Sequence, residues 1–162
     1  MTKFRFITKT YSVQMSDTFL RFIPVNPDFI PERVNQDRAK KYLIHIFKKT
    51  EIEVIETDDV EFVDPGANFE NVYCNLCGEE LETETWQEAM DEGYKTVFQN
   101  LSFITRCCHS LTSLNELKYH WPAGFAKFMI SLLKPCLDIK ENELKELENI
   151  LGTKVRKIWA HY

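Results

Sequence analysis

Apolar residues along the chain recur with the spacing of strands in some stretches and of helices in others. Residues 3–13, KFRFITKTYSV, are rich in aromatic and β-branched residues and predict a strand. Residues 51–56, EIEVIE, alternate charged and aliphatic positions, as a half-buried strand does. Further strands are predicted over residues 60–63, before a turn at Asp64-Pro65-Gly66, and over the C-terminal KVRKIWAHY.

Helical spacing is clearest over residues 32–47, where Ala39, Leu43 and Phe47 share one face with their apolar neighbours. Three further helices are indicated by local start and stop signals. These signals are a capping box at Thr85 and Glu88, Pro122 as a first helical residue, Pro135 as a stop, Asp138 as a cap and Gly152 as a closing residue. Residues 23–31, with three prolines, are expected to form an extended connector.

Helices and strands therefore mix along the chain, which indicates an α+β protein. A single mixed sheet with helices packed mainly on one face is the simplest way to bury the predicted apolar faces. The length of 162 residues suits one domain over residues 1–162. Its apolar fraction of 44% is enough for a sizeable core.

No stretch approaches the ~18–20 continuous apolar residues that a membrane span requires. The N-terminal MTKFRFITKT lacks an unbroken apolar segment, so we expect no secretory signal. We therefore expect a cytoplasmic protein with no membrane partner, in a compartment where disulfides are rare.

Four of the five cysteines form two pairs, CNLCG over residues 74–78 and RCCH over residues 106–109. This arrangement favours a metal site over a disulfide framework. Cys74 and Cys77 can turn toward one ion, and Gly78 can adopt a positive φ behind them. Thiol redox proteins place C-x-x-C at the start of a helix, which Gly78 would interrupt here.

Zinc takes four ligands in structural sites, so two more must come from the second pair. Cys107 and Cys108 would complete a set of four thiolates if they lie in a turn at a strand end. Cys107 and His109 share one face of a strand and would give three thiolates and one imidazole. We favour structural zinc bound by Cys74, Cys77, Cys107 and Cys108, with His109 as the alternative ligand; free buried thiols are the remaining option. The site would join both ends of a zinc-ribbon-like insert at about residues 70–117.

The motif order argues against one class of zinc enzyme. Nucleobase deaminases place H-x-E before P-C-x-x-C, whereas no H-x-E occurs here and C-x-x-C comes first. Two tight ligand clusters favour a closed structural ion, because a catalytic zinc keeps one position open. The alternative function is a zinc-dependent hydrolytic enzyme with an open metal position near Tyr119 and His120, which could line a cleft.

Several short motifs resemble those of an uncharacterised bacterial family with a zinc ribbon in its middle. The matching stretches are CNLCG at 74–78, RCCH at 106–109, SLNEL at 113–117, WPAGF at 121–125 and IWAHY at 158–162. The family pattern has glycine where this chain has His109, and proline in place of Asn75 and Arg106. The resemblance supports the four-cysteine ligand set and implies no activity.

Charge is distributed unevenly. Residues 51–93 contain fifteen Asp and Glu and no Lys or Arg, whereas the segments on both sides are basic. This acidic block either faces its own basic flanks or attracts a basic protein partner, and it would repel the phosphates of nucleic acids. We therefore expect a non-catalytic binding or interaction protein that does not bind nucleic acid.

Overall fold

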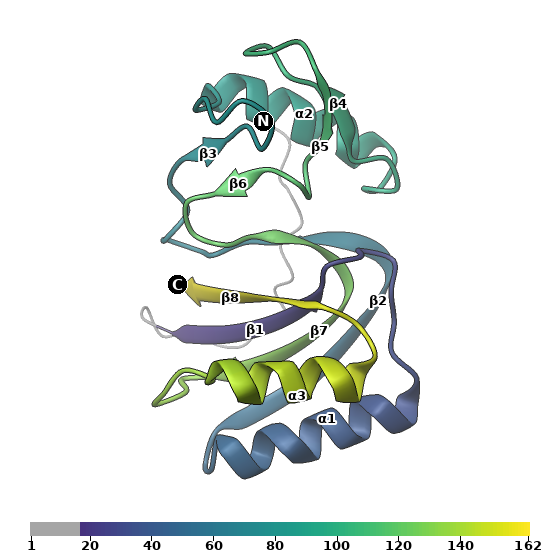
Figure 1. The fold of residues 1–162 in the computed structure, drawn as a ribbon, viewed down its shortest axis with the longest axis vertical. Coiled ribbons are helices and arrows are strands. Elements are labelled where there is room, and N and C mark those ends of the chain that lie inside the picture. Colours follow the sequence, from purple (N-terminus) through teal and green to yellow (C-terminus); the bar gives the residue numbers. More distant parts are fainter. Residues whose placement is uncertain (1–16) are drawn as a thin grey trace.

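The computed structural model describes residues 17–162, so the strand predicted over residues 3–13 lies outside the described part. The described chain forms two lobes (Figure 1). We call the four-stranded sheet with two helices the sheet lobe, and residues 64–123 the ribbon lobe. None of the helices in residues 17–162 combines the length and apolar character needed to cross a membrane.

The sheet lobe is built on four strands in the spatial order β2-β7-β1-β8. Its strands are β1 (Thr18–Pro24), β2 (Glu51–Val63), β7 (Gly124–Leu133) and β8 (Val155–His161). All three strand pairings are antiparallel. Among the described residues, the mixed direction we expected is present only at an isolated parallel bridge between Gly66 and His161.

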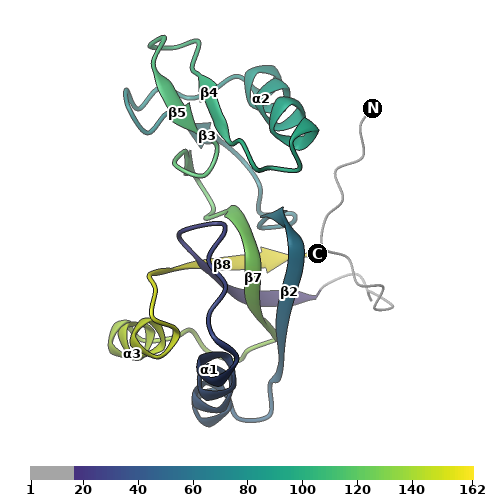
Figure 2. The ribbon, with the colours of Figure 1, turned by 90° about the vertical axis from the view of Figure 1, so that its right-hand side faces the viewer.

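Two helices, α1 (Arg33–Ile46) and α3 (Glu141–Leu151), cover one face of this sheet, as Figure 2 shows from the side. Leu20 and Phe22 of β1 alternate toward that face and are fully buried. They share a core with Leu43 of α1 and Leu147 of α3. The α+β class and the placement of helices on one face are therefore confirmed.

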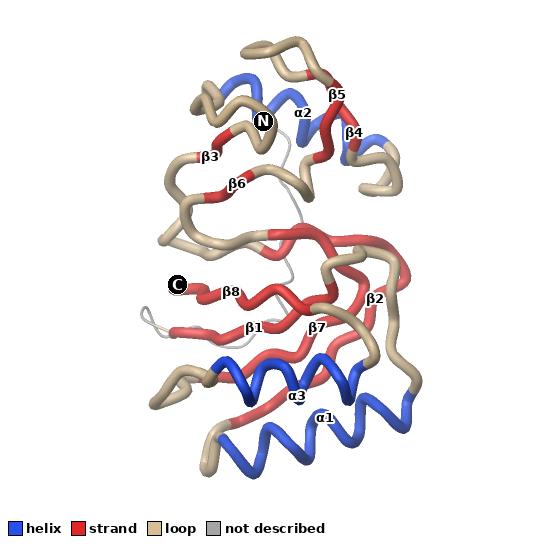
Figure 3. The backbone as a smooth tube through the Cα atoms, in the orientation of Figure 1, coloured by secondary structure: helices blue, strands red, loops and turns tan. Residues whose placement is uncertain are grey.

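The ribbon lobe lies between β2 and β7, two strands that pair directly with each other. Its elements are β3 (Val72–Tyr73), α2 (Thr83–Lys95), β4 (Ser102–Ile104), β5 (Leu111–Ser113) and β6 (Lys118–Tyr119). β3 pairs with β6 and β4 with β5, so the lobe holds two ribbons of two short strands each (Figure 3). A second core under α2 includes Met90, Leu114 and Phe125.

Asn115 and Arg156 join the two lobes through hydrogen bonds. The Asn115 amide donates to the Val25 carbonyl at 2.9 Å, and its Oδ1 accepts from the Phe125 backbone at 3.2 Å. The Arg156 guanidinium of β8 donates to Asn115 Oδ1 at 3.1 Å and to its backbone carbonyl at 3.0 Å. One side chain from each lobe thus ties β8, the connector after β1 and the start of β7 together.

The largest error of the sequence prediction is the helix expected after Pro122. Those residues form β7, which lies between β1 and β2 and is buried on both faces. A strand buried on both sides has no polar alternation, so its apolar run looks like that of a buried helix.

Strand β1 is not among the predicted elements. It ends at Pro24, inside the connector predicted over residues 23–31. The two strands predicted over 51–56 and 60–63 are one strand, β2, with a bulge between Glu56 and Glu61.

Both predicted side-chain caps are wrong. Helix α2 begins at Thr83, so Thr85 lies inside the helix and is buried. Asp138 instead accepts a hydrogen bond from the Ile139 backbone, and α3 starts at Glu141 after Lys140. Gly152 does close α3, in the left-handed conformation with φ of 75°.

Candidate metal centre

The four paired cysteines meet in the ribbon lobe. The sulfur atoms of Cys74, Cys77, Cys107 and Cys108 all lie within 4.8 Å of one another, and they are the one group of this kind in the described part of the chain. Cys74 and Cys108 Sγ are 3.9 Å apart, and Cys77 and Cys107 Sγ are 3.4 Å apart. Such a cluster could hold a metal ion.

The first knuckle is the turn from Cys74 to Gly78. Gly78 has φ of 81° and donates its N–H to the Cys74 carbonyl at 3.0 Å. The Cys74 N–H in turn donates to the Glu79 carbonyl at 2.8 Å. This tight turn directs the Leu76 N–H toward Cys74 Sγ at 3.4 Å. The glycine therefore has the role that the sequence predicted for it.

The second knuckle repeats the same hydrogen bonds from Thr105 to His109. His109 donates its N–H to the Thr105 carbonyl at 3.0 Å, and the Thr105 N–H donates to the Ser110 carbonyl at 3.0 Å. Thr105 therefore stands where Cys74 stands in the first knuckle, and Cys108 where Cys77 stands. Cys107, one residue earlier, supplies the second sulfur of this turn.

His109 occupies the position of Gly78 in this correspondence. Its φ is 54°, in the left-handed region that favours glycine, and its side chain is exposed. It is not a member of the cluster of possible ligands within residues 17–162. The family pattern has glycine where this chain has His109. The difference thus lies at a position that is defined by its left-handed backbone conformation and not by a side-chain ligand.

The spacing and surroundings of the sulfur atoms fit a thiolate-bound ion. Tetrahedral coordination with metal–sulfur bonds of ~2.3 Å places sulfur atoms ~3.8 Å apart, close to the two measured separations. The buried Thr105 hydroxyl lies 3.2 Å from Cys108 Sγ. Hydrogen bonds from Thr105 and Ser110 lower the pKa of Cys108 to about 6, against a smaller opposing effect of desolvation.

Two other thiols of the cluster, Cys74 and Cys77, also have shifted pKa values. Desolvation raises the pKa of Cys74, but hydrogen bonds from the Cys77 and Leu76 backbones outweigh it and lower the pKa. For Cys77, a backbone hydrogen bond from Glu79 lowers the pKa, but the hydrogen bond to Cys107, desolvation and the hydrogen bonds to Cys74 and Cys108 together raise it to about 12. Metal ligation requires ionised thiols, so a bound cation would displace protons from this cluster.

The Tyr119–His120 region is held by structural contacts. The Tyr119 hydroxyl donates to the Leu114 carbonyl at 2.9 Å and accepts from Trp86 Nε1 at 3.4 Å. Burial raises its pKa, with Trp86 and Arg156 as smaller opposing influences. His120 is exposed and lies 3.5 Å from Glu70. Neither residue belongs to the cysteine cluster.

The acidic block is mainly a surface feature. Twelve of its fifteen carboxylates are exposed. Glu53 and Glu61 are half-buried. Asp64 is buried and accepts hydrogen bonds from Gly66 N–H at 2.6 Å and Tyr162 at 3.2 Å. Ion pairs within the described chain join members of the block to Arg33, Lys95, Arg106 and His120.

Three of the motifs that carry the family resemblance have structural explanations. The asparagine of SLNEL is Asn115 at the lobe junction. The glycine of WPAGF is Gly124, where an added Cβ would lie 2.5 Å from Arg156 Nη1. The terminal tyrosine of IWAHY accepts a hydrogen bond from Arg21 Nη1 at 3.0 Å. Sequence reasoning missed Thr105 and Arg156, because neither residue type signals a knuckle position or a buried junction.

Comparisons with known proteins identify no relative of this chain. No protein-family model matches the chain, and searches of curated proteins and of solved structures found no significant similarity. The likeness to a zinc-ribbon family therefore stays a resemblance of motifs.

Proposed function

We propose that the protein is a non-catalytic binding protein whose ribbon lobe is held by a structural zinc ion. The proposed ligands are Cys74, Cys77, Cys107 and Cys108. The observation that carries this proposal is the cluster of four sulfur atoms within 4.8 Å. Four thiolates complete a tetrahedral shell and leave no position for a reactive water, which is the difference between structural and catalytic zinc.

Sulfur-only sites select zinc or iron among the common metals. Zinc is the better fit because the thiols come from two knuckles joined to short ribbons, as in zinc ribbons. Elemental analysis of protein purified under reducing conditions should give about one zinc per chain. Iron in place of zinc would contradict the metal assignment, and metal-free protein that stays fully folded would contradict the structural role.

The alternative of a zinc-dependent hydrolase near Tyr119 and His120 gains no support from the contacts of these residues. The Tyr119 hydroxyl already donates to the Leu114 carbonyl and accepts from Trp86 Nε1, so it is not available to bind or activate a substrate. Three protein ligands and one water on the metal, with hydrolysis of a test ester lost on His120→Ala, would restore this alternative.

For the partner, we propose a basic protein that meets the acidic block of residues 51–93. Twelve exposed carboxylates speed the encounter with a positively charged surface and make it salt-sensitive. The same charge disfavours nucleic acids, whose phosphates would be repelled.

Asp58 and Asp59 offer a direct test, because both are exposed in the bulge of β2. Host proteins captured at low salt by the wild type should be lost from the double variant Asp58→Lys, Asp59→Lys. A control charge reversal outside the acidic block, Glu141→Lys in α3, should retain them. Equal capture by both variants, or tight binding of duplex DNA at ~0.15 M salt, would contradict the proposal.

A further inference from the structure

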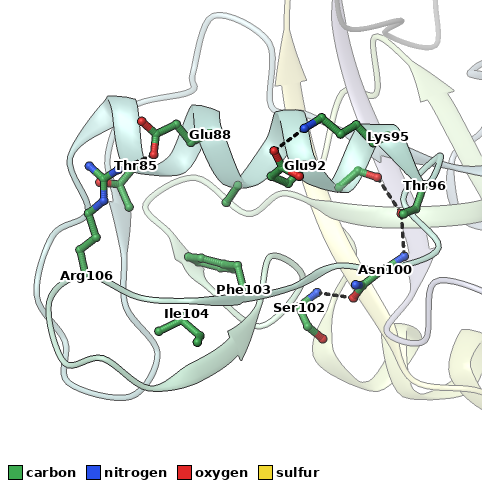
Figure 4. A pocket seen from close by; sticks show the side chains of 12 residues that line it. Thr85, Glu88, Glu92, Lys95, Thr96, Asn100, Ser102, Phe103, Ile104 and Arg106 are labelled. Carbon is green, nitrogen blue, oxygen red and sulfur yellow. Dashed lines mark hydrogen bonds and ion pairs between the residues drawn. The ribbon is translucent and has the colours of Figure 1, made fainter.

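A groove runs between α2 and β4 in the ribbon lobe (Figure 4). Its volume is about 590 Å³, within the range of ligand-binding clefts. Ala89 and Gly93 of α2 line one wall, and Phe103 and Ile104 of β4 line the other. The ion pair between Glu88 and Arg106 links the two walls.

Within residues 17–162, no strand lies beside the edge of β4 that borders this groove. β4 pairs only with β5 among the described strands, and Figure 2 shows β4 between β5 and α2. A two-stranded ribbon is marginal by itself, and a third strand would complete a more stable sheet.

The hydrogen-bond register identifies which backbone groups point into the groove. Leu114 N–H donates to the Leu101 carbonyl at 2.8 Å, and Thr105 N–H donates to the Ser110 carbonyl at 3.0 Å. Alternation along an antiparallel pair then directs the backbone groups of Ser102 and Ile104 away from β5. Ser102 N–H is taken by Asn100 Oδ1 at 3.0 Å. The Ser102 carbonyl and both backbone polar groups of Ile104 have no hydrogen-bond partner among residues 17–162, so they can bond to an incoming strand.

The side chains around this edge indicate what such a strand would carry. Ile104 and Leu111 are a cross-strand pair on the outer face, and they are 65% and 69% exposed. On the opposite face, Phe103 packs against the core beneath α2, and Glu88 and Glu92 of α2 line the groove. In an added strand, the residue opposite Ile104 would place its side chain on the same face as the Ile104 side chain. The residues before and after it would place theirs on the face toward α2.

We propose that the groove binds an extended segment of a partner protein as a third strand on β4, with aliphatic and basic residues in alternation. The segment runs antiparallel to β4, and the backbone groups of its aliphatic residues bond to β4. Their side chains lie beside Ile104, on the face that Ile104 shares with Leu111. The basic residues reach Glu88 and Glu92. Both carboxylates already have exposed partners, Arg106 and Lys95, but exposed pairs of this kind are weak and can be exchanged.

This inference deepens the proposed binding function and rests on it, so its test must separate strand pairing from charge alone. The probe is a capped, fluorescently labelled peptide of alternating valine and lysine, titrated into the metal-loaded protein and followed by anisotropy. Methylating the backbone nitrogens of the valines should weaken binding at least tenfold, because these N–H groups face β4. Methylating the backbone nitrogens of the lysines should leave the affinity within about twofold, because in an antiparallel pair those N–H groups face away from β4.

Two protein variants complete the test. Ile104→Pro removes the central donor of the edge while keeping an apolar side chain, and should abolish binding in protein that retains its metal. Glu88→Lys with Glu92→Lys should also abolish binding, whereas Glu141→Lys in α3 should not. If Ile104→Pro does not fold, the methylated peptides still decide the matter.

Equal binding of all three peptides, lost on reversal of Glu88 and Glu92, would overturn strand addition while leaving the acidic-face proposal intact. No binding of the parent peptide at millimolar concentration would overturn the inference outright. Self-association of the protein through β4, detected by sedimentation and removed by Ile104→Pro, would also overturn it, because a second copy of the chain would then be the occupant.

Discussion

The two lobes are stabilised in different ways. The sheet lobe has a continuous apolar core between one sheet face and two helices, with Phe22, Phe128 and Leu147 almost fully buried. The ribbon lobe has one helix and two ribbons of only two or three residues per strand. Strands this short cannot hold a fold by themselves, so its knuckles depend on something other than pairing.

The difference shows how a small insert can be added to a sheet without enlarging the core of that sheet. The second core draws Phe62 from β2 and Phe125 from β7, so one side of the ribbon lobe rests on the sheet lobe. The opposite end, with Cys77 and Cys107, is exposed. On our account the metal fixes this outer end, and the apolar core and Asn115 fix the inner one.

Metal removal should have the largest effect and should separate the lobes. Binding of zinc contributes on the order of 10 kcal/mol in small zinc fingers, and less is expected where a core exists. A chelator under reducing conditions should speed amide exchange across β3 to β6 while the amides of β1 and β7 stay protected. Uniform loss of protection in both lobes would show that they unfold as one unit.

The cysteines provide a matched pair for the same comparison. Cys74→Ser should lose the metal and loosen the ribbon lobe, because it removes a ligand that is fully buried. Cys136→Ser should retain the metal and the melting temperature, because Cys136 is exposed and outside the cluster. Metal content and thermal melting measure both outcomes, and equal behaviour of the two variants would contradict the assignment.

In the sheet lobe, truncation of the core should destabilise the protein without releasing metal from the folded form. Phe22→Ala should cost about 3–5 kcal/mol, the usual range for a buried phenylalanine. Val34→Ala, at a position that is 59% exposed on α1, should change the free energy of unfolding by less than about 0.5 kcal/mol. Urea unfolding measures the free energy of unfolding of both variants, and elemental analysis measures the metal content of the folded protein. Metal loss from folded Phe22→Ala would contradict the view that the two lobes are stabilised independently.

At the junction, Asn115→Ala should cost about 2–3 kcal/mol, because it removes the side-chain partner of the Val25 carbonyl and of the Phe125 N–H. The Arg156 guanidinium loses one acceptor but keeps the backbone carbonyls of residue 115 and Ala123. The exposed Asn142 in α3 serves as the control, and Asn142→Ala should be close to neutral. A small effect at Asn115 would mean that the apolar core alone joins the lobes.

The elements that could be predicted are those whose sequence signal lies within a few neighbouring residues. The alternation in β2, the face of α1 and the glycine after α3 each give a signal within a few residues. β7 could not be predicted as a strand, because burial on both faces removes the alternation that marks strands. Its environment is created by β1 and β2, which are distant in sequence, so no local window contains the information.

The candidate site was visible because cysteine pairs are distinctive, but its second half could not be read from the sequence. The equivalence of Thr105 with Cys74 and of His109 with Gly78 appears only in the repeated backbone hydrogen bonds. Adjacent Cys107 and Cys108 would point apart on a strand, and they converge because the chain turns there. The same turn explains why His109 was a plausible ligand in sequence and lies outside the cluster in space.

The smallest predicted effect concerns His109. His109→Gly should relieve left-handed strain of ~1–2 kcal/mol, partly offset by greater freedom of the unfolded chain, for a net gain of up to ~1 kcal/mol. The metal should remain bound, as it should in His109→Ala. Thermal melting and metal content check this, and metal release from both variants would support the ligand set with three cysteines and His109.

X-ray absorption at the zinc edge of the purified protein tests the central claim most directly, because it counts the atoms bound to the metal. The account predicts a first shell of four sulfur atoms at ~2.3 Å and no lighter ligand. Three sulfur atoms with one nitrogen at ~2.0–2.1 Å would instead identify His109 as a ligand, and a shell containing water oxygen would contradict a closed structural site.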